Sequence, residues 1–527
     1  MDENWQASIK FINSFVNANL LRRFDDINQI LSCRGTTLSA LSQQPRLQKI
    51  LNLESNDTRL VEVRIALLSS SINRAHGALQ ESLSVATSLL DLVGPCRDLG
   101  LSIEAAVHME AADALWDQGE MTSSIGMLQA IDRSSSKNQT IPIGRSRLLS
   151  KIGHQVSVAR LEKPDRIIEK YLKPALKDLR GRSEGSDAGQ VYHQFAVFCD
   201  QQLQDPDGLE DLERLKNLSE MKANEVTDLE NLLRHSKGDE RSRYNGYLKK
   251  AKTWLKLDEQ ELQRHCASRD EFLRQCLENY LLALSASDEH DSNALRFTAL
   301  WLKHSGEPFA NEAVANHMQR VPSRKFATLM NQLSSRLLDQ GVKFQELLFA
   351  LVLRICTEHP YHGMYSIYAG TNNRPNANDD VAVSRTQATS NVARRLTNDA
   401  KAGPIWQAIS YMNKYYCNLA GEKDDQKYKA GKKIRLKDSP AGSRLVALVL
   451  SEKNQIPPPT MQIDLMANCD YTKVPRMCEF EPLMSIAFGV SAPKIITAKA
   501  TNGVEYKQLV GRLSTRKQYF QSSTDIQ

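Results

Sequence analysis

The spacing of apolar side chains constrains the fold most, because between about residues 60 and 360 they recur at every third and fourth position. This is the period of an amphipathic helix, whereas a half-buried strand would alternate at every second position. In the segment from Ile103 to Ile131, two such apolar runs flank Gly119. We therefore predict two helices joined by a tight turn, with small residues on the first helix that let the second pack closely.

Further helices are predicted along the same stretch. They are expected at Ile167 to Leu179, at Val191 to Leu203 with an apolar stripe, and in a long charged pair at 209–233 and 240–257, whose charged faces we expect to be solvated. No strict repeat period is visible. The predicted fold class is mainly α, a degenerate tetratricopeptide-like α-solenoid.

Composition excludes several classes of protein. A net charge of +6 over 527 residues is too dilute for a nucleic-acid footprint, so no direct nucleic-acid binding is indicated. Uninterrupted apolar runs such as Leu445 to Leu450 are far shorter than the roughly 20 residues that cross a bilayer. Because the first residues do not resemble a signal peptide, we expect an intracellular chain with no membrane partner.

The nine cysteines include no Cys-x-x-Cys pair, and an odd count cannot complete a disulfide framework. We interpret them as reduced core residues. His265, Cys266 and Cys276 could supply metal ligands, but no second paired element accompanies them. We therefore predict no metal site.

Two polar segments interrupt the helical pattern. Thr371 to Asp380 is too polar to bury apolar surface, and it predicts a loop between helices. Gly421 to Arg444 is rich in lysine. It predicts either a solvated connector, the interpretation we favour, or a surface that contacts anions.

The pattern changes after Ile456, where Pro457, Pro458 and Pro459 favour an extended linker. Strands are predicted within 460–465, 483–488, 494–500 and 504–510, and Asn502-Gly503 between the last two is a strong hairpin signal. The predicted domains are a helical repeat domain at 1–450, a Pro-rich linker at 451–459, a short β-rich region at 460–510 and a tail at 511–527.

Several blocks of the chain resemble a known family when taken together. They include Tyr171-Leu172-Lys173-Pro174-Ala175, Leu300 to Gly306, Val321 to Phe326, Glu358-His359-Pro360-Tyr361-His362 and Phe488 to Lys494. In this order they resemble the FAT domain of phosphatidylinositol-3-kinase-related protein kinases, followed by the start of the kinase N-lobe. The residues within these blocks are similar to those of the ATM branch, which includes the fungal telomere-length-maintenance kinases.

The resemblance implies a fold and an activity for the intact family member. FAT helices wrap the kinase domain as a C-shaped clamp and help to form a homodimer. The kinase uses ATP and Mg²⁺ to phosphorylate Ser or Thr before Gln. It acts in DNA-damage checkpoint signalling and telomere maintenance in the nucleus, with a sensor complex for DNA double-strand breaks as partner and the remainder of the kinase domain beside the FAT helices.

The resemblance also assigns a nucleotide-covering loop to Gly489, Val490, Ser491, Ala492, Pro493 and Lys494. Taken alone, a Gly between two strands would indicate only a turn. The family pattern continues with a lysine directly after Gln-Leu-Val, but Gly511 follows Val510 here, and no catalytic loop or metal-binding aspartate is identified. We therefore predict no catalytic residue and no independent kinase activity. We attribute residues from about Gly511 onward to a truncated or misread gene model, and expect the incomplete lobe to expose its sheet.

Two other functions stay open at this point. The chain could be a helical scaffold that binds partners on its concave face, or the FAT segment of another branch of the same family. We interpret Trp116 and Trp301 as packing anchors. His359 and His362 bracket Pro360 at a helix end, where we expect capping or surface roles.

Overall fold

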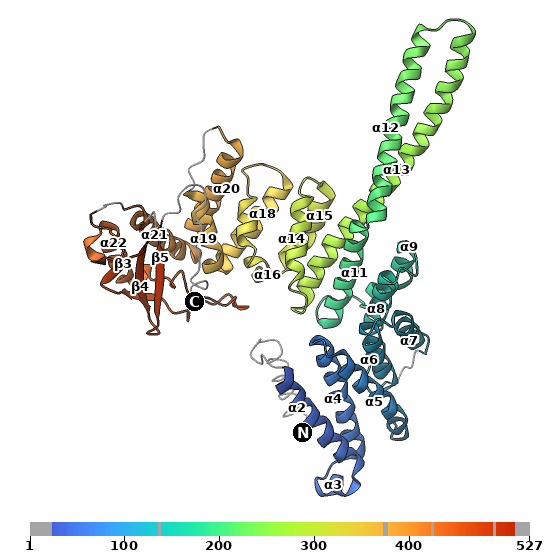
Figure 1. Cartoon of the computed structure of the whole chain (residues 1–527), viewed down its shortest axis with the longest axis horizontal. Coiled ribbons are helices and arrows are strands. Elements are labelled where there is room, and N and C mark those ends of the chain that lie inside the picture. Colours follow the sequence, from blue (N-terminus) through green and yellow to red (C-terminus); the bar gives the residue numbers. More distant parts are fainter. Residues whose placement is uncertain (1–23, 135–138, 373–377, 423–425, 489–491, 512–527) are drawn as a thin grey trace. The chain divides into compact units, whose positions relative to one another are not determined.

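The computed structural model describes residues 24–134, 139–372, 378–422, 426–488 and 492–511. It is mainly helical, as predicted, with a small antiparallel sheet near the C-terminus (Figure 1). The chain divides into two compact units, Met1–Asn279 and Tyr280–Gln527, called here the first and the second unit. This division falls inside the segment predicted as one helical domain. Among the described residues, none of the helices combines the length and the apolar character that crossing a bilayer requires.

Successive helices of the first unit pack against one another, with a core around Val63, Leu89 and Val107. The predicted hairpin is confirmed: α6 and α7 are joined at Gly119, whose φ of +89° suits a residue without Cβ. The helices are α2 (Phe24–Gln43), α3 (Pro45–Ile50), α4 (Ser55–Ala75), α5 (Leu79–Asp98), α6 (Glu104–Asp117), α7 (Met121–Ser134), α8 (Arg145–Val158), α9 (Pro164–Ile167), a π-helical turn (Ile168–Leu172), α10 (Lys173–Asp178) and α11 (Ser186–Gln204).

The predicted charged pair is a long antiparallel hairpin of α12 (Pro206–His235) and α13 (Asp239–Ala286), drawn in green in Figure 1. Its narrow seam contains Val226, Leu248 and Ala251, and Lys252 pairs with Glu230 across it at 2.7 Å. The charged faces are exposed, as expected for a hairpin that buries only one stripe. The last residues of α13 enter the second unit.

The second unit begins with helices packed around Trp301, which is fully buried and confirms its predicted role as a packing anchor. Its indole Nε1 donates to Asn311 Oδ1 at 3.0 Å, and its ring contacts Phe344 edge to face. Trp116, in the first unit, is only half-buried. The helices are α14 (Asn293–Lys303), α15 (Pro308–His317), α16 (Arg324–Ala327), α17 (Met330–Ser335), α18 (Lys343–Glu358), α19 (Pro360–Thr371), α20 (Asp380–Thr397), α21 (Ala402–Gly421) and α22 (Pro440–Val449).

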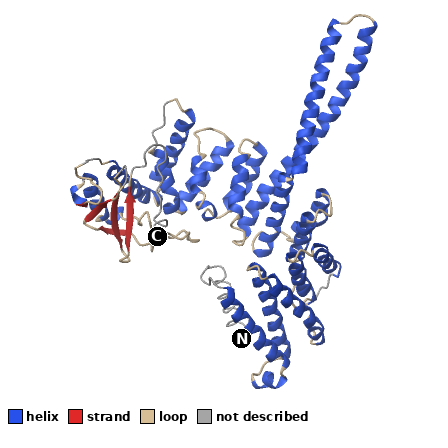
Figure 2. Cartoon of the chain, in the orientation of Figure 1, coloured by secondary structure: helices blue, strands red, loops and turns tan. Residues whose placement is uncertain are grey.

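The sheet lies beside α21 and α22 (Figure 2). Its central strand β4 (Lys494–Ala500) pairs with β5 (Glu505–Val510) on one side, which confirms the hairpin, and Gly503 in the turn has a φ of +80°. On the other side β4 pairs successively with β2 (Met477–Phe480) and β3 (Leu483–Ile486), and β1 (Lys433–Arg435) pairs with β3.

Three expectations about this region are corrected. Gly421 to Arg444 is no solvated connector over its described part, because it supplies β1 and the start of α22 and buries Leu436. No strand forms at 460–465. The sheet is not exposed as expected, because α21 and α22 cover the face that contains the buried residues Met484, Ile496 and Ala498. Pro457 and Pro458, in the segment predicted as a linker, are buried as well.

The cysteines are free, as expected, but only Cys96, Cys199, Cys276 and Cys356 are buried. Cys33, Cys417 and Cys469 are exposed, and Cys266 and Cys478 are half-buried. The expectation of nine core cysteines was therefore wrong. A cysteine is small enough to stay on a helix surface or in a loop, so residue type alone did not decide its burial.

Candidate functional site

The predicted nucleotide-covering loop connects β3 to β4. Gly489, Val490 and Ser491 lie outside the described residues. The described end of the loop is held to the sheet, because the backbone N–H of Ala487 donates to the carbonyl of Pro493 at 2.8 Å. Ala492 has a φ of +42°, an uncommon backbone conformation for a residue with a Cβ.

Lys494, the last residue of the predicted loop, is 1% exposed. Its Nζ donates to the backbone carbonyl of Glu422 at 2.7 Å and lies 4.7 Å from the ring centre of Tyr428. Burial lowers the pKa of Lys494, although the charge of Glu422 acts in the opposite direction. The ammonium group thus ties the start of β4 to the C-terminal end of α21, and any contribution of the loop to nucleotide binding stays a prediction.

Glu422 itself is the centre of a polar network that sequence reasoning missed. Its carboxylate accepts from Tyr428 Oη at 2.5 Å, Ser439 Oγ at 2.8 Å and the backbone N–H of Ala441 at 2.9 Å. Burial alone would raise the pKa of Glu422, but these hydrogen bonds outweigh it and the pKa is lowered. We call Glu422, Tyr428, Ser439 and Lys494 the Glu422 network.

A local signal for part of this network is present in the sequence. Ser439 precedes Pro440, and a Ser before a Pro is typical of a helix start. In the structure Ser439 caps α22 by accepting from the backbone N–H of Gly442 at 2.9 Å. The hydroxyl donates to the Glu422 carboxylate at the same time, while Lys494 donates to the backbone carbonyl of the same residue, so the end of α21, the start of α22 and the start of β4 meet at Glu422.

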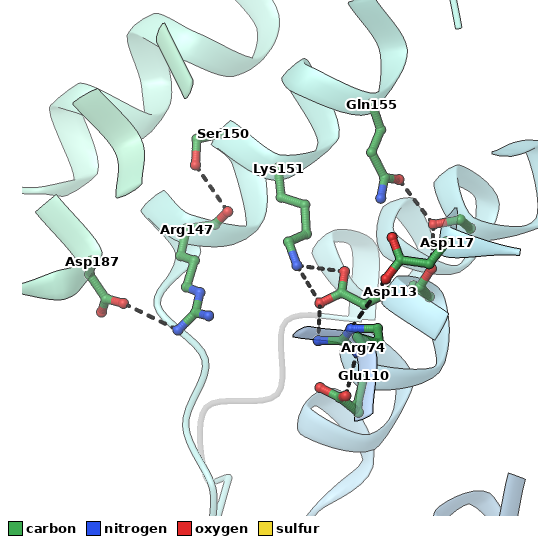
Figure 3. Close-up of polar contacts among 11 residues, drawn as sticks. Arg74, Glu110, Asp113, Asp117, Arg147, Ser150, Lys151, Gln155 and Asp187 are labelled. Carbon is green, nitrogen blue, oxygen red and sulfur yellow. Dashed lines mark hydrogen bonds and ion pairs between the residues drawn. The ribbon is translucent and has the colours of Figure 1, made fainter. Parts of the chain in front are cut away.

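The first unit contains a second polar cluster, on α4, α6 and α8 (Figure 3). Lys151 Nζ lies 2.5 Å from Asp113, and Arg74 pairs with Glu110, with Asp113 at 3.6 Å and with Asp117 at 3.4 Å. We call these five residues the Arg74 cluster. Sequence reasoning missed it, although Glu110, Asp113 and Asp117 share one face of α6 at helical spacing.

The Arg74 cluster contains three carboxylates and two cations, and its carboxyl groups have shifted pKa values. Burial raises the pKa of Glu110 above its ordinary value of 4.5, although Arg74 opposes the shift. Burial also raises the pKa of Asp117. We interpret the cluster as a structural contact that holds three helices together.

The candidate histidines lie at the corner between α18 and α19. His359 is 1% exposed, so a surface role was wrong, and its ring Nδ1 is 2.6 Å from Tyr471 Oη instead of capping α19. His362 Nε2 lies 2.9 Å from the carbonyl of Ile463. Burial, assisted by His362, lowers the pKa of His359 to about 4. Both histidines therefore connect the corner to the segment that precedes β2.

His265, Cys266 and Cys276, which the sequence offered as possible metal ligands, do not form a group of ligands among the described residues. Cys276 is buried and its thiol donates to the carbonyl of Ala196 at 3.4 Å, whereas Cys266 is half-buried. Over the described ranges, the one group of three potential ligands is Glu358, His359 and Cys469.

Comparison with known proteins identifies the family. No protein-family model matches the chain. The serine/threonine-protein kinase tel1 of Neurospora crassa is 52% identical over 511 residues, which cover 96% of this chain and 17% of that protein. The chain thus spans less than a fifth of the length of this curated relative.

Solved structures give the same result. One described as "FAT and kinase domain of CtTel1" matches with a TM-score of 0.82 and 54% identity, covering 92% of this chain and 33% of that one. Another, described as "Complete CtTel1 dimer with C2 symmetry", matches with a TM-score of 0.82 and 54% identity over 93% of this chain and 18% of that one. The chain therefore belongs to the family of fungal Tel1 serine/threonine-protein kinases, in which it corresponds to the FAT segment.

Proposed function

We propose that this FAT segment braces the nucleotide-binding lobe of a kinase that phosphorylates Ser or Thr before Gln. The activity belongs to the whole protein, of which the chain covers a minor share. Its contribution is mechanical: helices α21 and α22 hold the first strands of the lobe in a fixed position. The phosphate-holding lysine, the catalytic loop and the metal-binding aspartate are supplied by residues outside this chain.

The observation that carries this proposal is the Glu422 network. Lys494 is the residue at which the predicted nucleotide-covering loop becomes β4, and its ammonium group is bound to the last turn of α21. Buried polar groups of this kind fix one arrangement of the elements that they join, because any other arrangement leaves them without partners. The FAT helix and the loop consequently move together or not at all.

ATP and Mg²⁺ are the proposed cofactors of the intact kinase. The described residues fit a role for the loop backbone, because Ala492 is in the left-handed region, where successive amides can point to one side. They do not offer the Lys494 ammonium to a phosphate, because Lys494 is 1% exposed and its Nζ points to the carbonyl of Glu422. Gly489 to Lys494 would therefore cover the nucleotide through backbone amides, while Lys494 positions the loop.

The proposed partners are those of a Tel1 kinase. One solved relative is a dimer with C2 symmetry, and we propose that the intact protein forms a homodimer of this kind. We also propose action at telomeres and DNA double-strand breaks in the nucleus, with a break-sensing complex as recruiting partner. The name of the relatives, Tel1, supports this assignment.

A chimeric kinase tests the proposal. Replacing the matching segment of the Neurospora crassa tel1 kinase by this chain up to Val510 should give a protein that phosphorylates a Ser-Gln peptide with Mg-ATP. The isolated 527-residue chain should transfer no phosphate in the same assay. A folded chimera without activity, or phosphate transfer by the isolated chain, would contradict the proposal.

A matched pair of substitutions in the active chimera tests the bracing role itself. Tyr428→Phe removes a hydrogen bond to Glu422, whereas Tyr247→Phe alters an exposed tyrosine on the α12–α13 hairpin. We expect the first change to raise the KM for ATP several-fold and the second to leave it unchanged. Equal KM values would show that the hydrogen bond from Tyr428 to Glu422 does not contribute to positioning the loop.

A second function, scaffolding, is favoured by the exposed side chains of the α12–α13 hairpin. Trp254 is 59% exposed, and Tyr247 and Leu257 also stand out from the seam. An exposed apolar patch of this kind is typical of a protein interaction surface. Trp254→Ala in the chimera should weaken dimerisation or partner binding without changing the KM for ATP.

A further inference from the structure

Three potential metal ligands converge in the second unit, at the corner between α18 and α19. They are Glu358, His359 and Cys469, and their ligand atoms all lie within 4.8 Å of one another. His359 Nε2 is 4.0 Å from Cys469 Sγ. Glu358 and His359 are neighbours in the chain, whereas Cys469 comes from the loop before β2.

The local backbone explains why the three side chains meet. Pro360 begins α19, so α18 ends at Glu358 and His359 leaves the helical conformation with a φ of −130° and a ψ of 64°. Cys469 has a φ of +55°, and its backbone N–H donates to the carbonyl of Met466 at 3.1 Å in a tight turn. A non-Gly residue in the left-handed region is uncommon and often marks a functional constraint.

The contacts of Glu358 and His359 with their neighbours engage one atom of each side chain and leave a second atom for the ion. Ser323 Oγ donates to Glu358 Oε2, which leaves the other carboxylate oxygen as a ligand. The contact between His359 Nδ1 and Tyr471 Oη occupies the outer ring nitrogen and leaves Nε2 toward Cys469. A hydrogen bond to the far nitrogen is the usual way in which a metal-binding histidine is oriented.

From this geometry we propose that Glu358, His359 and Cys469 form a binding site for a borderline-soft divalent cation such as Zn²⁺. Imidazole nitrogen, thiolate sulfur and carboxylate oxygen are the ligands that Zn²⁺ takes in proteins, and water completes a tetrahedral shell. Binding displaces the thiol proton of Cys469 into solvent, and the thiolate and the carboxylate then neutralise the two positive charges of the ion.

The surroundings allow the ion to enter. Cys469 is exposed, so the site is open to solvent on one side. The nearby Arg324 guanidinium is paired with Asp288 at 2.5 Å and with Asp291 at 3.5 Å, which reduces its repulsion of a cation. The ion would strengthen the connection that His359 and His362 already make between the helical corner and the segment before β2.

Metal titration of the purified 527-residue chain tests the site. After removal of metals by a chelator, we expect one equivalent of Co²⁺ to bind with the intense near-ultraviolet absorption of a cobalt thiolate, and Zn²⁺ to displace it. Cys469→Ser should abolish this absorption, whereas Cys417→Ser, which alters another exposed cysteine, should leave it intact. Tyr471→Phe should weaken binding by about 10- to 100-fold, as loss of an outer partner usually does.

Two results of the metal titration would overturn the proposal. One is the absence of stoichiometric binding, and the other is an unchanged cobalt spectrum in Cys469→Ser. A measurement on the unaltered chain makes the test independent of folding of the variants: Zn²⁺ should protect Cys469 from alkylation at least ten-fold, and Cys417 not at all. Equal alkylation rates with and without Zn²⁺ would exclude the site.

Discussion

In the Arg74 cluster, three carboxylates are paired with two cationic side chains, whereas in the Glu422 network a carboxylate is held by two hydroxyls and a backbone N–H. The lysine of the second group, Lys494, is likewise held by a backbone carbonyl and an aromatic ring. The first arrangement pairs charge with charge, and the second satisfies charge with dipoles.

The two arrangements should respond differently to substitution. A cluster of opposite charges becomes unbalanced when one cation is lost, because the remaining carboxylates repel one another in a poorly solvated place. A group held by several dipoles loses one hydrogen bond at a time. The shifts of the two carboxyl groups reflect this, since the pKa of Glu110 is raised and that of Glu422 is lowered.

The largest expected effect follows from removing the central cation of the Arg74 cluster. Arg74→Met should destabilise the first unit by about 3 kcal/mol, the lower end for a broken buried ion pair because the site is partly exposed. Hydrogen exchange of backbone amides in α4, α6 and α8 measures this. Arg97→Met is the matched control, because Arg97 pairs with Glu104 at the surface and should cost less than about 0.5 kcal/mol. Equal losses of stability in the two variants would show that the Arg74 cluster contributes no more than a surface ion pair.

A smaller effect is expected from Glu422→Gln. The amide keeps the shape but turns an NH₂ group toward a donor, either the hydroxyls or the Ala441 N–H, so one charged hydrogen bond is lost at a cost of about 2 kcal/mol. Hydrogen exchange in α22 and β4 measures the loss. Glu452→Gln, at an exposed position, serves as control. An unchanged exchange rate in α22 would mean that the carboxylate does not hold the start of this helix.

Lys494→Met should have a still smaller effect, about 1 kcal/mol or less, because the loss of one hydrogen bond is offset by relief from burying a charge. The methionine side chain can still pack on the Tyr428 ring. Thermal unfolding of the second unit gives the measurement. A loss as large as that of Arg74→Met would show that charge, rather than hydrogen bonding, holds this network.

The smallest effect is on the pH dependence of stability. The contributions of Glu110 and Glu422 should change with pH in opposite directions. A raised pKa means that folded Glu110 binds more protons than unfolded Glu110, so the contribution of Glu110 to stability decreases as pH rises through the range just above 4.5. Glu422 has a lowered pKa, so its contribution is complete above 4.5 and is lost as pH falls through its folded value. Glu110→Gln should weaken the first trend, to which Asp117 also contributes, and leave the second unchanged, as followed by hydrogen exchange in α6 and α22 between pH 4 and 7. The same sign in both units would contradict the comparison.

Much of the fold could be predicted from local patterns. The α6–α7 hairpin, the long α12–α13 pair and the β4–β5 hairpin all follow from helix periodicity or from Asn502-Gly503. These elements are set by residues near one another in the chain. The burial of Trp301 was also predicted, whereas Trp116, predicted on the same grounds, is only half-buried, so a large aromatic residue on a helix does not by itself fix its burial.

The polar sites could not be predicted, because their members come from distant segments. Lys494 meets Glu422 across 72 positions, and Cys469 meets His359 across 110. The lysine-rich stretch near residue 430 also had to fold against β3 before its Ile434 became a buried strand residue. Local composition indicated a connector, and tertiary packing overrode it.

The amino-acid order by itself determined which stretches are helices, where the last hairpin turns and to which kinase family the chain is similar. Only the tertiary structure decided which charges are buried and what satisfies them, as for Lys494 against α21. The physical reason is that helix and turn preferences depend on neighbouring residues, whereas the free energy of a buried charge depends on the groups that surround it in space.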